Sequence, residues 1–516
     1  MNDRGRADGL ALTAALLTLA TACGSKPNPS AGGAAPEADA GALRATGSSA
    51  GGGAANDAPL GGDTGERSPS SSYATPDAGQ SPPRGLPEAD VAPAELDVDV
   101  FGVLGNRYWL DASVQEVAVM NAPFQPAIAG PFEGDLYSPL GPAPLTFLDH
   151  LFVTTGGESA HTADFGKVQV RLIGQSTARP WTMYSLPNFK LDTDEFSVGN
   201  RVGGVKHLRL NNAVAGNIFR EKLALDLYRA LGYPAPRAVH AWVAGSVWGP
   251  EVSVPYVVVE AYKPQFCKQR AAELGGGCVN MWELSGDLGG GALGEPDNCQ
   301  LSACSPARGL ELEAAIASTP RGDGYEAALA GWIDWAAFHR FQCLSWILQT
   351  GDDALHTLNN VVLVERVDGK FQLLPYSVDL SFGQGWPDVV RMGGQSSLAA
   401  GCQSDSGCWA ETIAACEQLV DAYRGADPVG RLDTLHAELA TAGMLRDGDE
   451  ALYAGLRTRL EERLAELPIE LEANRAGPVG GSCPYPLVQC GDACVSVEAC
   501  PPCEPGDAGA QACLPP

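Results

Sequence analysis

The chain has 516 residues, of which 45% are hydrophobic, so it is long enough to bury a sizeable core and to form two or three domains. Its formal net charge at pH 7 is -28. We expect no nucleic-acid partner, because so acidic a chain repels a phosphate backbone unless its basic residues are segregated, and the sequence has no basic run.

Residues 1–23 have the pattern of an export signal. Two arginines precede an apolar region at 10–19, and a small-residue cleavage site ends at Cys23. The pattern resembles a bacterial lipoprotein signal, which implies lipidation of Cys23; ordinary secretion is the alternative, because Ala20 stands where Leu is usual. No other apolar run is long enough to span a bilayer, so the membrane would be reached through the lipid anchor only.

Two further segments lack the large apolar residues that a core needs. Residues 24–97 are rich in Gly, Ala, Ser, Pro and Asp, which predicts a disordered linker. Residues 476–516 form a Cys-rich tail that needs disulfides to be ordered. The folded domain is therefore expected between them, at 98–475.

The cysteines favour disulfides over metal sites. Apart from Cys23, an even number remains, which in an exported chain indicates paired thiols. Short separations favour bridges that staple loops, such as Cys267 with Cys278, Cys299 with Cys304, and Cys402 with Cys408, while sequence alone leaves the connectivity open. A zinc site is the less favoured alternative for the tail residues Cys490, Cys494, Cys500 and Cys503, because no His lies near them.

The first half of the domain is predicted to consist mainly of strands, with two helices. The expected strands are 106–110, 167–173, 188–191, 205–212, 238–243 and 254–260, and the expected helices are 113–120 and 218–231. Ser113 is the expected cap of the first helix. Glu221 lies off the apolar stripe of the second helix, and the helical period favours a solvated carboxylate over one that turns inward to a lysine.

The second half of the domain is predicted to be mainly helical. Residues 260–334 are rich in Gly and Cys and predict a disulfide-stapled surface loop. A single core helix is expected at 325–349, with His339 on the helix surface or packed rather than catalytic. Helices are then expected at 409–424, 430–442 and 450–474, the last with an apolar stripe of leucines at 452, 456, 460, 464 and 467.

A β-hairpin separates these helical regions. Strands at 361–364 and 371–374 flank a turn at 367–370, and the second strand leads to Asp379. Carboxylates and amides then lie at the ends of paired strands, where they suit Mg²⁺ held against a phosphate. Asp and Asn are also common turn residues, which is the competing explanation.

Several stretches in this order resemble the spore coat protein H (CotH) kinase family. They are R-L-I-G-Q-S at 171–176, F-K-L at 189–191, L-R-L-N-N at 208–212, F-R-E-K-L-A at 219–224, L-G-Y-P-A-P-R-A at 231–238 and V-V-V-E at 257–260. Further along, the family pattern has an Asp, an Asn pair seven and eight residues later, and a Pro-aromatic segment that closes on Asp. Asp352, Asn359, Asn360, Pro375-Tyr376 and Asp379 fit it. The resemblance covers 169–383, and residues 409–475 resemble the helical lower lobe.

The resemblance implies an α+β, divergent protein-kinase-like two-lobed fold. It also implies ATP-dependent transfer of phosphate to Ser or Thr hydroxyls of a secreted or surface protein, with Mg²⁺ or Mn²⁺. Asp352 would be the catalytic base, and Asn359, Asn360 and Asp379 would hold metal. The implied nucleotide-binding residues are Lys190, Glu221 (which would orient Lys190), Arg171, Gly174, Ser176 and Glu260.

Three points stay open. Asp353, beside Asp352, could exchange roles with it. Tyr376 stands where the family has Trp. A non-catalytic, pseudokinase-like binding lipoprotein of the envelope or surface is the alternative function. Either protein is expected outside the cytoplasm, in the periplasm or at the cell surface.

Overall fold

The computed structural model describes residues 86–475 with gaps, together with 477, 487–490 and 493–496. The gaps are 94–95, 97–99, 125–143, 157–159, 175–178, 214–217, 285, 290, 292, 294–297, 300–304, 354 and 384–391. The predictions for the signal and Cys23, the linker up to residue 85, Ser176, Cys304, Cys500 and Cys503 therefore lie outside the described residues. All described residues belong to one compact unit, Ser68–Pro516.

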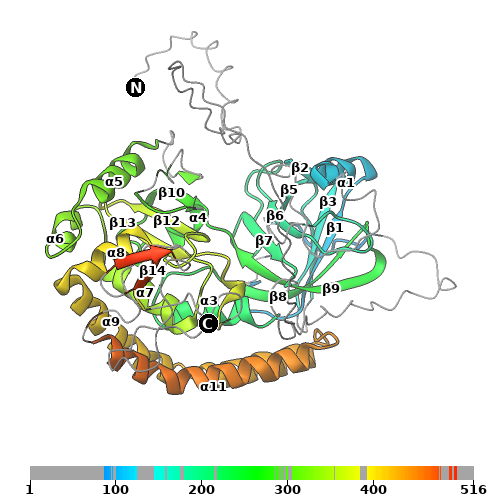
Figure 1. Ribbon diagram of the computed structural model, residues 1–516. Coiled ribbons are helices and arrows are strands. Elements are labelled where there is room, and N and C mark those ends of the chain that lie inside the picture. Colours follow the sequence, from blue (N-terminus) through cyan, green and yellow to red (C-terminus); the bar gives the residue numbers. More distant parts are fainter. Residues whose placement is uncertain are drawn as a thin grey trace, which may run out of the picture. The chain divides into compact units, whose positions relative to one another are not determined.

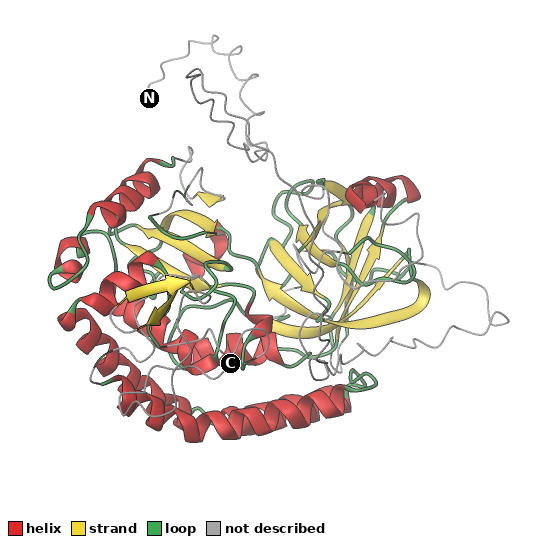
Figure 2. Ribbon diagram, in the orientation of Figure 1, coloured by secondary structure: helices red, strands yellow, loops and turns green. Residues whose placement is uncertain are grey.

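A large curled sheet forms the first part of this unit (Figures 1 and 2). Its strand order is β2-β5-β6-β7-β9-β8-β1-β3-β4, and the pairs are antiparallel except for β1 with β8. The strands are β1 Asn106–Asp111, β2 Thr146–Leu148, β3 His150–Thr154, β4 Thr162–Asp164, β5 Val168–Ile173, β6 Asn188–Asp192, β7 His207–Asn211, β8 Ala238–Gly245 and β9 Gly249–Glu260.

Alternation of apolar and polar residues builds this sheet. In β5, Val168, Val170 and Leu172 are buried while the residues between them are partly exposed, and β6 and β7 repeat the pattern. The buried side chains form one core around Trp181. Helix α1 (Val114–Asn121), followed by the 3-10 turn η2 (Ala122–Phe124), begins as predicted at Ser113, whose hydroxyl accepts from the Glu116 N–H at 3.2 Å.

A second, smaller sheet carries most of the helices. Its order is β11-β10-β12-β13, from β10 Cys278–Leu284, β11 Asn298–Cys299, β12 Val361–Arg366 and β13 Phe371–Pro375. The helices around it are α4 Pro264–Gln269, α5 Ala307–Ser318, α6 Tyr325–Leu329, α7 Trp335–Leu348, η3 Val378–Leu380, α8 Ser397–Ser404, α9 Ser406–Gly425, α10 Pro428–Thr441 and α11 Asp449–Asn474. The pair β14 Leu487–Cys490 and β15 Ala493–Ser496 lies in the tail. None of the helices described here combines the length and apolarity needed to cross a bilayer.

Helix α3 (Arg220–Ala230) connects the two sheets. It packs against β8 of the first sheet and against η3, which follows the second sheet. Its apolar side chains belong to the core of the second sheet. Arg220 also donates hydrogen bonds to the carbonyls of Ser381 and Phe382, just after η3. A substitution in α3 is therefore expected to alter its packing against both sheets.

Disulfides tie the helical part together. Cys267–Cys278 and Cys402–Cys408 are bonded as predicted, and a third bond, Cys343–Cys416, joins α7 to α9 across 73 residues. Disulfides persist in oxidising compartments, so these bonds indicate that the chain works outside the cytoplasm.

Four predictions about the elements were wrong. The predicted linker 24–97 ends too late, because the Asp90 and Val91 N–H groups donate to the Thr162 carbonyl and Leu96 is buried in the core of the first sheet. Residues 278–284 form strand β10 at the centre of the second sheet rather than part of a surface loop. Residues 330–334 break the expected long helix into α6 and α7, because Asp334 caps α7 with its carboxylate on the Ala337 N–H. Leu452 is 44% exposed, so the leucine stripe of α11 becomes buried only further along the helix.

Candidate functional site

Three cations form a row across the first sheet. Arg171 of β5 lies opposite Lys190 of β6, and Lys190 lies opposite Arg209 of β7. Like charges directly opposite one another destabilise a sheet, so such a row is suited to an anion that compensates them. Burial lowers the pKa of Lys190 to about 8, and Lys263 adds the next largest repulsion.

The row opens into a cavity lined by both sheets. The cavity is narrow and partly open to solvent, with room for about one water molecule, and the second sheet contributes Glu283 and Tyr376 to its wall. The remaining lining residues are Lys190, Arg209, Ala261, Tyr262, Met281, Trp282 and Val362. Cations and aromatic rings around a narrow space suit an anion attached to a flat apolar group.

The acidic turn after α7 separates two neighbouring carboxylates. Asp353 is 2% exposed and accepts hydrogen bonds from the Ser345 hydroxyl, from the backbone N–H groups of Leu355 and His356, and from the His356 ring. Its oxygens thus hold the turn in shape. Asp352 is partly exposed, so it is the carboxylate of the pair that can meet a ligand.

Asp352 is joined to the Asn pair that precedes β12. Its carboxylate accepts from the Thr357 hydroxyl at 2.9 Å, from the Asn359 amide at 3.3 Å, and from the Asn360 amide. Asn360 has a φ of +46°, a left-handed conformation that Asn adopts more readily than most residues. Because both amide nitrogens face Asp352, both amide oxygens point away from it and suit a metal ion.

Two further carboxylates lie beside one another at α3 and η3. The Glu221 carboxylate accepts two hydrogen bonds from the Asn211 amide, at 2.7 and 2.9 Å. Burial and the neighbouring Asp379 raise the pKa of Glu221 to about 7. Burial also raises the pKa of Asp379, with Asp352 adding repulsion. The prediction of a solvated Glu221 was wrong, because α3 is covered by the two sheets on more than one face.

Arg209 brings the cation row and the acids together. Its positive charge acts on Glu221, Asp379 and Glu283, and its guanidinium lies 4.3 Å from the centre of the Tyr376 ring. Among the described residues, its Nε and the Asn211 Oδ1 are buried polar atoms without a hydrogen-bond partner. A donor and an acceptor left unsatisfied beside repelling carboxylates fit a bound phosphate and cation.

The other predicted nucleotide residues lie at strand ends. Gly174 follows β5 with a φ of +114°, which L-residues rarely adopt, while its neighbour Ser176 is outside the described residues. The Glu260 carboxylate, at the end of β9, is paired with Arg237 and Arg270, each at 3.2 Å. The Glu260 side chain is therefore engaged within the protein, and its backbone N–H donates to the Arg237 carbonyl at 2.9 Å.

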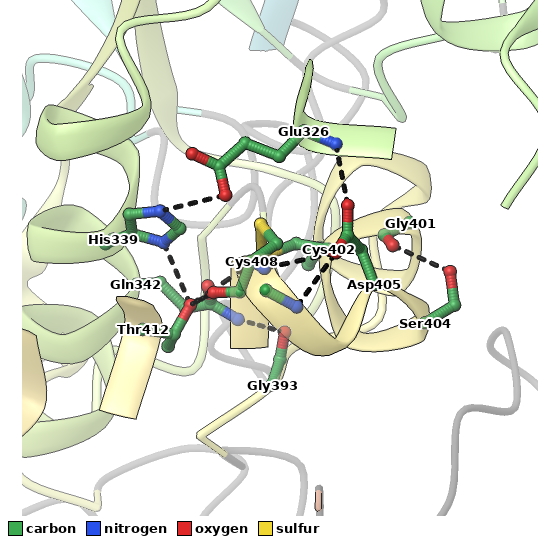
Figure 3. The surroundings of a disulfide bond; sticks show 12 residues. Glu326, His339, Gln342, Gly393, Gly401, Cys402, Ser404, Asp405, Cys408 and Thr412 are labelled. Atoms are coloured by element: carbon green, nitrogen blue, oxygen red, sulfur yellow. Dashed lines mark hydrogen bonds and ion pairs between the residues drawn. A yellow bond between two sulfur atoms is a disulfide. The ribbon is translucent and has the colours of Figure 1, made fainter. Parts of the chain in front are cut away.

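The ligand-like cluster of His339, Cys402 and Cys408 is not a metal site here. The three side chains lie within 4.8 Å of one another, but the two sulfur atoms are bonded to each other. Figure 3 shows the His339 ring between Glu326 and Thr412, with its Nδ1 2.9 Å from the Thr412 hydroxyl. His339 is buried against α9, as predicted for a packed residue.

Sequence reasoning missed Arg209, Asn211 and Glu283. The alternation of β7 carries a signal for the first two, because His207, Arg209 and Asn211 share the face that Lys190 occupies on β6. Glu283 gives no such signal, since its segment was read as a loop.

Comparison with known proteins agrees with this geometry. Residues 170–426 match the family described as CotH kinase protein. The match runs from β5 to just after α9, so it includes the cation row, Asp352, the Asn pair and Asp379. A comparison with curated proteins found none that matches the chain. The matched region is a CotH kinase family domain.

Proposed function

We propose that this CotH kinase family domain has a divergent protein-kinase-like two-lobed fold and transfers the γ-phosphate of ATP to a Ser or Thr hydroxyl of a secreted or surface protein. The first sheet would be the upper lobe, and the second sheet with its helices the lower lobe. The observation that carries the proposal is the meeting of three in-register cations and three carboxylates at Arg209.

Asp352 would accept the proton of the substrate hydroxyl. It is partly exposed, and three donors hold it in one orientation. The proton would pass from the hydroxyl oxygen to a carboxylate oxygen as that hydroxyl bonds to the γ-phosphorus, and the bond from the γ-phosphorus to the bridging oxygen would break, so that ADP leaves with that oxygen. Asp353 has no such freedom, because its oxygens are used within the turn.

The remaining residues would bind and neutralise the phosphates. Asn359, Asn360 and Asp379 have the oxygen ligands that Mg²⁺ or Mn²⁺ prefers, and a bound ion would reduce the repulsion that raises the pKa of Asp379. Lys190, Arg171 and Arg209 would hold the phosphate oxygens. Phosphoryl transfer depends mainly on positioning and charge neutralisation, so these groups suffice for the chemistry.

The disulfides and the signal-like segment support a location outside the cytoplasm. The disulfides fit a compartment outside the cytoplasm, where secreted or surface proteins would be its substrates. The signal-like segment ending at Cys23 supports attachment to a membrane through lipid, in the periplasm or at the cell surface.

Phosphate transfer from labelled γ-ATP tests the proposal. The purified chain, with Mg²⁺ and a Ser-rich acceptor, should incorporate phosphate, and Asp352→Asn and Asp379→Asn should each abolish incorporation. Glu311→Gln, which changes an exposed carboxylate on α5, is the matched control and should stay active. Binding of ATP by the unchanged chain without transfer would instead support a pseudokinase-like binding lipoprotein.

A further inference from the structure

We propose that Glu283 of β10, held by the Tyr376 hydroxyl, is the residue that orients Lys190 towards the phosphates. This inference rests on the proposed function, because it concerns how that nucleotide site is built. It gives to Glu283 the positioning role that the family resemblance implies for Glu221.

Glu221 is engaged elsewhere. Both of its carboxylate oxygens accept hydrogen bonds from Asn211, and the charged groups that act on it are Asp379 and Arg209. Lys190 is not among them. The carboxylate of α3 therefore belongs to the acid cluster, and Lys190 needs another anion to hold its charged form in the cavity.

Glu283, on the part of the cavity wall that the second sheet forms, can provide this anion. It lines the same cavity as Lys190, and among the described residues its charge favours the protonated lysine against repulsion from Lys263, Arg171 and Arg209. Loss of contact with water opposes the charged form of Glu283, but the charges of Lys190, Arg209 and Arg171 and the Tyr376 hydrogen bond together lower its pKa, so the carboxylate stays charged.

Tyr376 fixes the position of Glu283. Its hydroxyl donates a hydrogen bond to the Glu283 carboxylate, and its ring packs under the Arg209 guanidinium. The backbone before it is anchored as well, because the Tyr262 hydroxyl donates to the Pro375 carbonyl at 2.5 Å. An indole carries its N–H elsewhere on a larger ring, so this bond belongs to the Tyr of this chain rather than to the Trp of the family.

The arrangement has a chemical reason. Arg209 and Lys190 repel each other across β6 and β7, and a lysine with a lowered pKa is easily discharged. A carboxylate placed on the far side of the cavity keeps the ammonium charged and extended towards it. The phosphate chain then meets a cation that is already in place, which lowers the ordering cost of binding.

A double-mutant cycle on Mg-ATP binding tests the inference. The dissociation constant of the purified full chain is measured by calorimetry for the unchanged protein, Glu283→Gln, Lys190→Met and the double variant. Glu283→Gln should weaken binding about tenfold, a typical coupling between charged groups that line one cavity. The double variant should bind no more weakly than Lys190→Met. Tyr376→Phe should weaken binding less, about threefold.

The outcomes separate this inference from the proposed function. No Mg-ATP binding by the unchanged protein overturns both. If the unchanged protein binds Mg-ATP and Glu283→Gln binds it equally or more tightly, the inference alone is overturned. The inference is also overturned if Glu283→Gln weakens binding by the same factor when Lys190 has been replaced by Met. Thermal unfolding is measured for each variant and for the exposed control Glu311→Gln, to confirm that each variant is folded. If Glu283→Gln does not fold, Tyr376→Phe, which deletes one oxygen, tests the same hydrogen-bonded pair.

Discussion

Asp352 and Asp353 are adjacent, but replacing each by Asn is predicted to affect different properties: Asp353→Asn the stability of the chain, and Asp352→Asn its phosphate transfer. Asp353→Asn should destabilise the chain, because the buried carboxylate accepts four hydrogen bonds and an amide can accept at only one of its two terminal atoms. Asp352→Asn should leave stability almost unchanged, because Asp352 is partly exposed and an amide oxygen can still accept from Thr357.

The magnitudes follow from these contacts. A hydrogen bond to a charged group contributes about 1.5–3 kcal/mol, and breaking a buried ionic network costs about 3–5 kcal/mol, so we expect Asp353→Asn to lower the free energy of unfolding by about 3 kcal/mol. At roughly 2–4 °C per kcal/mol, the Tm should fall by roughly 6–12 °C. Asp352→Asn should change stability by less than about 1 kcal/mol but lower phosphate transfer about 10²- to 10⁴-fold, as expected for a general base.

Thermal unfolding and initial rates of phosphate transfer, measured on the same preparations, distinguish the two. Asp353→Asn should keep substantial activity below its lowered Tm. If Asp353→Asn instead abolishes transfer at unchanged Tm, while Asp352→Asn remains active, the roles are reversed and the reading of this turn is refuted.

Three further predictions concern stability and pH. Replacing Cys343 and Cys416 together by Ser should cost about 4 kcal/mol in urea unfolding, since the bond closes a loop of 73 residues; an unchanged midpoint would contradict this. Arg463→Ala should cost about 3 kcal/mol, because the buried guanidinium binds two carbonyls of α7 and Glu470, and Arg463→Lys should recover only part of it. Lys190 loses its proton above about pH 8, so Mg-ATP binding should weaken from pH 7 to 9, whereas Lys190→Arg should show no such dependence. The pKa of Lys190 is about 8 in the folded chain and 10.5 in the unfolded chain, so the unfolded chain binds more protons between these values. The free energy of unfolding should therefore rise as the pH is raised from about 8 to 10.5.

The sequence predicted the parts of the fold that depend on local pattern. The hairpin of β12 and β13 could be predicted because β-branched residues flank a turn with Asp368-Gly369, and the alternation of β5 identified a half-buried strand. Ser113 and the helices α9 to α11 followed from capping and periodicity.

Features that depend on tertiary contacts could not be predicted in this way. Strand β10 is flanked by Gly and Cys, and its buried pairing with β12 is visible only in three dimensions. The Cys343–Cys416 bond joins residues whose separation gives no local signal. Glu221 was misplaced because a helical period assumes one buried face, whereas α3 is covered by two sheets.

In the candidate site too, residues with local spacing could be predicted from the sequence, and residues brought in by tertiary contacts could not. The family resemblance indicated Asp352, the Asn pair and Asp379, whose spacing is local. The partners that surround Lys190 come from β7, β10 and the end of β13, so the roles of Arg209 and Glu283 required the folded structure.

A crystal structure of the chain with Mn²⁺ and a non-hydrolysable ATP analogue tests the central claim most directly. Manganese gives an anomalous signal that locates the ion without assumption. The account predicts this signal between Asn360 and Asp379, with the phosphates against Lys190 and Arg209 and the γ-phosphate facing Asp352. Manganese and nucleotide bound elsewhere, with these residues in contact with neither, would contradict it.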